Sequence, residues 1–256
     1  MRCSKAAKQS PLCTDLLSMK SPFLRILWHL PLLAVVLFAL GASAEDPNDL
    51  RGERVGWARL KTASPHWKGH AQTDPRLIRF FREETTLNID PTWYEADVDD
   101  LKEMCSYPLL FAQNIQPVTD PNARHNLAEY VRRGGFLLID ACINPNLRGN
   151  PDTFISEQIR TLKICLPEAQ VSLLPNDHEI FHCFFKFNAG PPHTEDHEGW
   201  GDHGLYGIYI GSRLAGVIST SGLQCGWAGM KPVPGHDSRC MQMLVNIYVY
   251  AMLRAG

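Results

Sequence analysis

The order of apolar and polar positions divides most of the chain into alternating strand-like and helix-like segments. Strand-like runs, either apolar or alternating, lie at residues 55–61, 88–95, 108–112, 136–139 and 170–174. Segments with apolar residues three or four positions apart, typical of amphipathic helices, begin near Asp74, Asp97, Asp120, Pro151 and Asp237. Two later runs, 205–210 and 214–220, are joined by Gly211-Ser-Arg213 and predict a hairpin.

Strands that alternate with helices predict an α/β fold with a mostly parallel sheet. We expect a three-layer flavodoxin-like sandwich with the C-terminal hairpin at the edge of the sheet. Asp74-Pro75 is expected to open a helix with Asp74 as the N-cap. Residues 180–187 predict a short helix or turn, and residues 221–236 predict an irregular loop.

The first 44 residues have the pattern of a secretory signal peptide. Leu24 to Leu40 is apolar, follows basic residues, and runs into Ala42-Ser43-Ala44, and Met19 is an alternative start. The alternative is an uncleaved membrane anchor. We therefore expect export to the periplasm or cell envelope, a linker at residues 45–54, and a single domain at residues 55–256.

Charge and cysteine spacing exclude two classes of protein. The whole chain has a net charge of −2; residues 1–44 hold five of the 25 basic and one of the 27 acidic residues, so the remainder carries 20 − 26 = −6. The sequence has no basic stripe of the kind that binds nucleic acid. The sequence also has no C-x-x-C pair, which a zinc ribbon requires. Buried free thiols are expected for Cys105, Cys165 and Cys240.

Candidate chemistry follows the ends of the predicted strands, where open α/β sheets bind ligands. Parallel strands carry their carboxyl ends to one edge, so we expect the loops that follow them to converge. The candidate ligand-binding residues are Gln113, Asp140, Asp177, His178 and Trp227. Trp227, within Cys225-Gly-Trp-Ala-Gly229, is either a stacking platform for a ligand or a hydrophobic plug.

Two catalytic arrangements are compatible with these residues. Cys142 and His178, with Asp140, could act as nucleophile, base and supporting acid. The glycine-flanked elbow that exposes such a nucleophile is absent, because Ala141 and Ile143 flank Cys142. The alternatives for Cys142 are a disulfide, for example with Cys225, or a buried thiol.

The second arrangement is a metal site. His178-Glu179-Ile-Phe-His182 has the H-E-x-x-H order in which two histidines bind zinc and the glutamate acts as base. A third ligand would come from one of the histidines of the following loop, namely His193, His197 and His203. The alternative is that Asp177 caps a short helix. The sequence identifies no cofactor.

Four motifs together resemble a known family. They are Arg133-Gly-Gly-Phe-Leu-Leu-Ile-Asp140, Asp177-His-x-Ile-Phe-His182, Cys225-Gly-Trp-x-Gly229 and Val245-Asn-Ile-x-Val-Tyr-Ala251, with Trp57-Ala-Arg-Leu-Lys61 near the start. In this order they resemble the family called domain of unknown function 4159, over about residues 54–253. The resemblance implies a fold similar to class I glutamine amidotransferases in exported or membrane-attached bacterial proteins, and no established activity.

Two functions follow as hypotheses. The first is a non-catalytic module that binds a small molecule or a cell-envelope protein at the carboxyl edge of the sheet. The second is a hydrolase that uses Cys142 with His178, or a metal bound by His178 and His182. No nucleic acid is expected as a partner, and a membrane only through an uncleaved N-terminal segment.

Overall fold

The computed structural model describes residues 53–141, 150–192, 204–230 and 235–254. The chain divides into two units, Met1–Asp49 and Leu50–Gly256, and the described residues all belong to the second. The predicted signal peptide and most of the linker lie outside the described residues, as do Cys142 and the loop histidines His193, His197 and His203. Among the described helices, none is both long and apolar enough to span a membrane.

Within these residues, seven strands form one mixed and mostly parallel sheet, in the order β2-β1-β3-β4-β7-β6-β5. Strands β1, β2, β3, β4 and β7 run parallel to one another, and β6 is antiparallel to both of its neighbours, β7 and β5. The strands are β1 (Val55–Lys61), β2 (Ile89–Asp97), β3 (Leu109–Ala112), β4 (Phe136–Asp140), β5 (Gln170–Leu173), β6 (Tyr206–Ile210) and β7 (Arg213–Ser219). The predicted mixed α/β architecture is thus confirmed.

The helices follow the predicted order, with one addition. The α-helices are α2 (Asp74–Glu84), α3 (Leu101–Met104), α4 (Pro121–Arg132), α5 (Pro151–Cys165), α6 (Leu223–Trp227) and α7 (His236–Arg254). The described residues also contain two short 3-10 helices, η2 (Ala71–Thr73) and η3 (Glu179–Phe181). The short helix α6 lies in the segment for which the sequence predicts an irregular loop.

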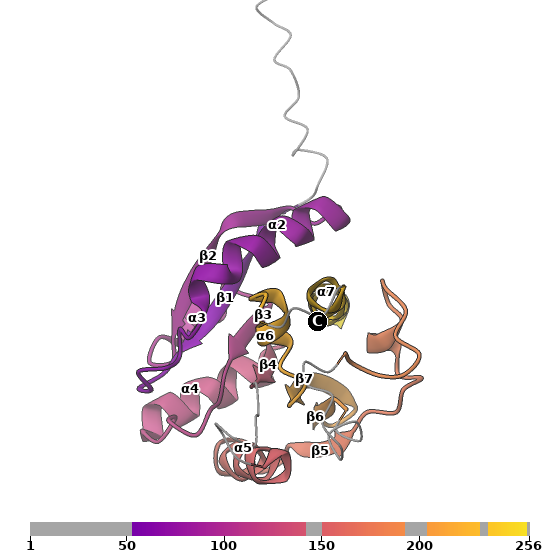
Figure 1. Ribbon diagram of the computed structural model, residues 1–256. Coiled ribbons are helices and arrows are strands. Elements are labelled where there is room, and N and C mark those ends of the chain that lie inside the picture. Colours follow the sequence, from indigo (N-terminus) through magenta and orange to yellow (C-terminus); the bar gives the residue numbers. More distant parts are fainter. Residues whose placement is uncertain (1–52, 142–149, 193–203, 231–234, 255–256) are drawn as a thin grey trace, which may run out of the picture. The chain divides into compact units, whose positions relative to one another are not determined.

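Helices cover both faces of the sheet, as Figure 1 shows. Alternate residues of a central strand point to opposite faces, so Phe136 and Leu138 of β4 join one hydrophobic cluster and Leu137 and Ile139 join the other. The first cluster contains side chains of α2, α6, α7 and η3, and the second contains side chains of α3, α4 and α5. Arg59 and Asp140 therefore point toward the face that carries α2, α6 and α7.

Sequence-encoded caps explain where two of the long helices begin. The Asp120 carboxylate accepts hydrogen bonds from the backbone N–H groups of Asn122 and Ala123 at the start of α4. The Asn150 side chain accepts one from Asp152 at the start of α5. A proline occupies the first helical position of each, where the missing N–H has no intrahelical partner in any case.

Three local expectations differ from the structure. The β6–β7 hairpin lies inside the sheet, because β5 pairs outside β6 and forms the edge. The helix expected from Asp97 begins only after Asp100, whose side chain caps α3, since β2 continues to Asp97. The thiol of Cys105 is exposed, because it follows α3 at the surface.

Gly134 and Gly135 end α4 for two different reasons. Gly134 has a φ of +104°, which favours glycine over any residue with a Cβ. Gly135 lies against the buried Tyr130, where an added Cβ would stand 2.4 Å from the ring. The Tyr130 hydroxyl oxygen lies 3.2 Å from the carbonyl oxygens of both Tyr107 and Phe136, which share its single hydrogen, so this close approach fixes the start of β4.

Candidate functional site

A buried ion pair joins β1 to the start of α2. Arg59 donates from Nε and Nη2 to the two carboxylate oxygens of Asp74, both at 2.6 Å, and Trp57 Nε1 donates to the same carboxylate at 3.0 Å. The side chains of Arg59 and Asp74 are completely buried. Asp74 does not cap α2 as predicted, because its carboxylate is held by Arg59. Thr73 occupies the N-cap position without a side-chain capping bond, and its hydroxyl donates instead to the His70 carbonyl oxygen. The guanidinium also lies 4.8 Å from the centre of the Phe111 ring.

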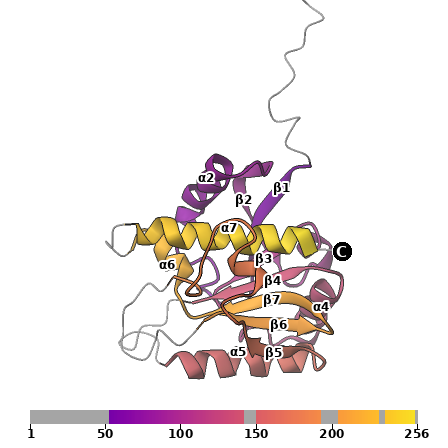
Figure 2. The same ribbon diagram turned by 90° about the vertical axis from the view of Figure 1, so that its right-hand side faces the viewer.

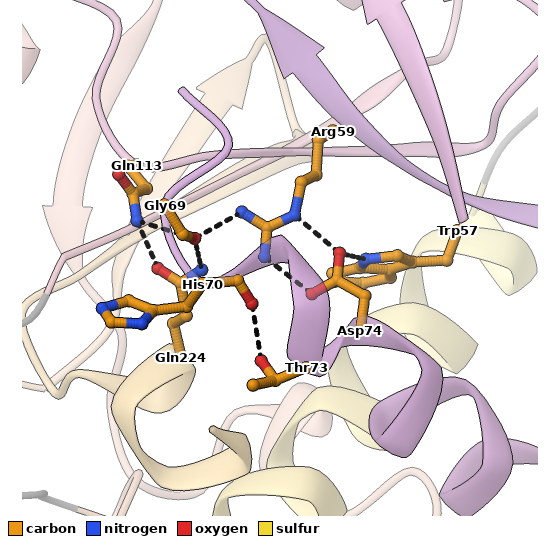
Figure 3. A network of polar contacts seen from close by, with 8 residues as sticks. All are labelled: Trp57, Arg59, Gly69, His70, Thr73, Asp74, Gln113 and Gln224. Atoms are coloured by element: carbon orange, nitrogen blue, oxygen red, sulfur yellow. Dashed lines mark hydrogen bonds and ion pairs between the residues drawn. The ribbon is translucent and has the colours of Figure 1, made fainter. Parts of the chain in front are cut away.

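The carbonyl oxygen of Gly69 is the point at which three elements meet (Figure 3). It accepts hydrogen bonds from Arg59 Nη1 on β1 (3.1 Å), Gln113 Nε2 after β3 (3.3 Å) and Gln224 Nε2 on α6 (2.6 Å). Gln113 Nε2 also donates to Gln224 Oε1 at 2.6 Å. The loop between β1 and α2, residues 62–73, is thereby held over the carboxyl edge of the sheet.

This meeting point coincides with a change in strand order. From β1 the chain moves to β2 on one side and then to β3 on the other, so the crevice between β1 and β3 is a topological switch point. Open α/β sheets bind ligands outside the carboxyl ends of the strands at such a point. We call the buried group Trp57, Arg59, Gly69, Asp74, Gln113 and Gln224 the switch-point network.

Asp140 connects β4 to the same network through α6. Its carboxylate accepts the backbone N–H groups of Leu223 (3.1 Å) and Gln224 (2.9 Å), the first residues of α6. Asp140 is completely buried, and this burial raises the pKa of its carboxyl group to about 6 despite these hydrogen bonds. A carboxylate at this position both caps α6 and places Gln224 against Gly69.

Replacing Asp140 by Asn is expected to change how stability depends on pH. A raised pKa means that the folded chain holds the proton more tightly than the unfolded chain, so this group's stabilising contribution falls as the pH rises from about 4 to above 6. Asn does not titrate. The free energy of unfolding of Asp140→Asn minus that of the wild type should rise by about 2 kcal/mol between about pH 4 and pH 7. Urea denaturation of both proteins at several pH values measures this difference, and a difference that stays constant with pH would contradict it.

A thiol near this carboxylate lies against an imidazole at the start of α7. Cys240 Sγ lies 3.4 Å from His236 Nε2, four residues earlier on the helix. Burial first, and then the charge of Asp140, raise the pKa of the Cys240 thiol far above its ordinary value. Burial lowers the pKa of His236. This pair is therefore neutral near pH 7, which is the opposite of an activated thiolate.

Trp227 fills the space between the network and the core. It is completely buried and packs edge-on against Trp57 (centroids 6.0 Å apart) and Phe111 (5.3 Å). Neither face of its ring is open for a ligand to stack on, so Trp227 is a hydrophobic plug rather than a stacking platform.

His178, Asp177 and His182 lie away from this site. Asp140 binds the start of α6, and Gly226 of α6 packs against Cys240 in the first part of α7. The His178 ring, in contrast, lies 5.7 Å from the ring of Tyr250, near the end of α7. Ten residues of α7 separate Cys240 from Tyr250, which corresponds to about 15 Å along the helix axis. Although β5 ends at the carboxyl edge, the segment after it folds back along α7. The expectation that Asp140 and His178 meet therefore does not hold, and Asp177 is exposed beside His178.

The H-E-x-x-H string does not form a helix turn. His178 has extended backbone angles and caps the three-residue η3, with its Nδ1 accepting from the Ile180 N–H. His182 lies 3.0 Å through Nε2 from the Asn176 carbonyl oxygen. The two rings therefore do not share a helix face. In the described parts of the chain, no three His, Cys, Asp or Glu side chains are grouped to hold a metal ion.

The structure thus brings together Gln113, Asp140 and Trp227 and separates them from Asp177, His178 and His182, while Cys142 lies outside the described residues. Sequence reasoning missed Arg59, Asp74, Gln224 and His236 as members of the site. A charged residue inside the strand pattern of β1, at the same face as Trp57, was the signal for Arg59. The four-residue spacing of His236 and Cys240 on a helix was the signal for that contact.

These features define an α/β protein whose candidate site is a buried polar network at the carboxyl edge of its sheet. Over residues 57–252 the chain matches the family described as domain of unknown function (DUF4159), and it belongs to that family. The family indicated by the sequence motifs is therefore confirmed. No curated protein matches the chain.

Proposed function

We propose that this chain is an exported, non-catalytic bacterial module that binds a small polar molecule or a cell-envelope protein at the carboxyl edge of its sheet. The loop at residues 62–73 forms the recognition surface. The N-terminal pattern of an apolar segment followed by Ala42-Ser43-Ala44 supports export. The proposed location rests on this sequence pattern, and the proposed partner rests on the site described above.

The finer fold assignment belongs to the same proposal. A switch point between β1 and β3 and helices on both faces of the sheet support a three-layer flavodoxin-like sandwich similar to class I glutamine amidotransferases. Such a fold hosts many activities, so the function rests on the site alone.

The single observation that carries the proposal is the convergence of three donors on the Gly69 carbonyl oxygen. The donors are the guanidinium group of Arg59 and the side-chain amides of Gln113 and Gln224. They hold a loop in place and do not present a nucleophile or a base. A loop fixed in advance by its own contacts loses little conformational entropy on binding, which favours recognition.

The side chains that this loop presents are suited to binding a polar or anionic group. His66 and Lys68 are exposed, Trp67 and His70 are partly exposed, and the Lys68 ammonium lies 5.5 Å from the centre of the Trp67 ring. His70 adopts a left-handed conformation with a φ of 59°, and in Figure 3 its ring extends away from Arg59 and Asp74. A neighbouring ring and ammonium can contact a planar group and a negative charge at the same time.

Thermal denaturation in the presence of defined compounds tests the proposal. The panel is inorganic phosphate, citrate, AMP, L-glutamate and N-acetylglucosamine. Binding by this loop predicts that at least one compound raises the Tm of the wild type, and that the shift is lost in Trp67→Ala and Lys68→Ala but kept in Lys102→Ala, an exposed lysine on α3. No shift with any compound would contradict the proposal.

The hydrolase alternative is tested on the same protein. Hydrolysis of p-nitrophenyl acetate or L-glutamine above background, lost in His178→Ala or on substitution of Cys142, would replace the binding proposal with the catalytic one. The positions of His178 and Cys240 favour the binding proposal, because neither supplies an activated base or thiolate beside Asp140.

A further inference from the structure

A second surface, separate from the switch-point network, lies between α2 and β2. A groove of about 420 Å³ is lined by Pro75, Ile78, Arg79, Arg82, Glu83 and Pro91. Its apolar part comes from Pro75, Ile78 and Pro91, and its charged wall comes from the exposed side of α2. Its volume is in the range of pockets that take small ligands or several side chains of a peptide.

The two arginines of this wall have no carboxylate partner among the described residues. Arg79 and Arg82 are exposed and form none of the ion pairs found there, whereas the preceding arginine of α2, Arg76, is paired with Asp237. The chain as a whole is acidic, with a net charge of −2. A basic wall in an acidic protein is a local feature that charge complementarity can use.

The other wall of the groove is an edge of the sheet. Strand β2 pairs with β1 on one side and with no other described strand. Pro91 has no backbone N–H, so an added chain cannot form a continuous ladder at this point. Side-chain ion pairs therefore have to supply the attraction here.

We propose that the groove between α2 and β2 binds an extended acidic peptide segment of a partner protein, with carboxylates on Arg79 and Arg82. Residues three apart on a helix have Cβ atoms about 5–6 Å apart. Alternate side chains of an extended peptide lie on one face about 6.6 Å apart. Glutamate or aspartate at every second position matches this spacing, and the apolar groove floor suits an apolar residue beside them. The concave shape and the acidic Glu83 fit a peptide better than a lipid surface or a nucleic-acid backbone.

Fluorescence anisotropy with the full-length chain tests this inference. The probe is a fluorescein-labelled peptide in which three glutamates alternate with valines, and the comparison peptide has glutamine in place of each glutamate. We expect the acidic peptide to bind and the glutamine peptide to bind about five- to thirtyfold more weakly, since two exposed ion pairs contribute about 0.5–1 kcal/mol each. The double variant Arg79→Glu/Arg82→Glu should weaken binding by a similar or larger factor at unchanged Tm.

The matched control is Arg132→Glu/Arg133→Glu, which changes two arginines at the end of α4 that are already paired with glutamates. It should leave the affinity unchanged. Equal binding of both peptides, an equal loss in the control variant, or no binding of the acidic peptide would overturn the inference. Tighter binding through the same arginines to phosphatidylserine vesicles or duplex DNA would overturn it in favour of a lipid or nucleic-acid surface. None of these outcomes depends on the loop at residues 62–73.

Discussion

Arg59→Met is expected to lower the free energy of unfolding by about 3–5 kcal/mol, the usual cost of removing one partner from a buried ion pair. The Asp74 carboxylate would remain completely buried with only the Trp57 N–H as a side-chain donor, and the Gly69 carbonyl would lose one of its three donors. Urea denaturation followed by circular dichroism measures the change.

The control for this prediction is Arg133→Met. That arginine pairs with Glu129 at the surface with 60 % of its side chain exposed, so its removal should change stability by less than about 0.5 kcal/mol. The double variant Arg59→Met/Asp74→Leu should recover part of the loss, because it leaves no unpaired charge in the core. A single Arg59→Met variant as stable as Arg133→Met would show that the pair does not hold β1 and α2 together.

Trp227→Ala is expected to destabilise the fold by about 3–5 kcal/mol, because it removes a large side chain from a fully packed position. Trp227 is completely buried against Trp57 and Phe111, and in the described structure its Nε1 has no hydrogen-bond partner. The loss is therefore one of packing, and Trp227→Phe should cost less than Trp227→Ala.

Trp67→Ala is the control for this second prediction, since Trp67 lies partly exposed on the loop at residues 62–73. We expect little change in the Tm for that variant. If Trp227→Ala and Trp67→Ala had the same stability, Trp227 would not be a plug, and the stacking-platform interpretation would regain its support.

Much of the fold is readable from the sequence because its signals are local. Apolar runs identify the strands, and Asp120-Pro121 and Asn150-Pro151 mark two helix starts by capping chemistry that needs only the next few residues. The order of strands and helices predicts a mostly parallel sheet, as observed.

The parts that sequence reasoning missed depend on contacts between distant residues. Helix α6 has five residues and no repeating apolar face, and its first turn is fixed by Asp140, more than 80 residues earlier in the chain. Asp74 has the sequence of an N-cap, but Arg59 at a core-facing position of β1 takes its carboxylate. A buried charge outcompetes a local capping bond because an unpaired charge in the core costs more.

The candidate site was predicted only in part, because it also depends on contacts between distant residues. Gln113 follows β3 and Asp140 is the last residue of β4, so the rule for carboxyl edges places them correctly. His178 follows β5, which also ends at that edge, but its segment turns back along α7 toward Tyr250 (Figure 2 shows the length of this helix across the sheet). The direction that a loop takes after a strand depends on the surface it packs against, which periodicity does not report.

The central claim is that the switch-point network holds the loop at residues 62–73 and helix α6 as one unit. Hydrogen exchange of the backbone amides of Gly69, Ala71 and Thr73, compared between the wild type and Gln224→Ala, tests it most directly. Gln224 does not contact these amides, which bond within the loop, but its side chain holds the Gly69 carbonyl. We predict faster exchange of all three amides in Gln224→Ala, with the β3 and β4 amides unchanged. The control Gln116→Ala, which removes a side-chain amide that bonds to Glu157 instead, should have no effect. Unchanged exchange of the loop in Gln224→Ala would contradict the account.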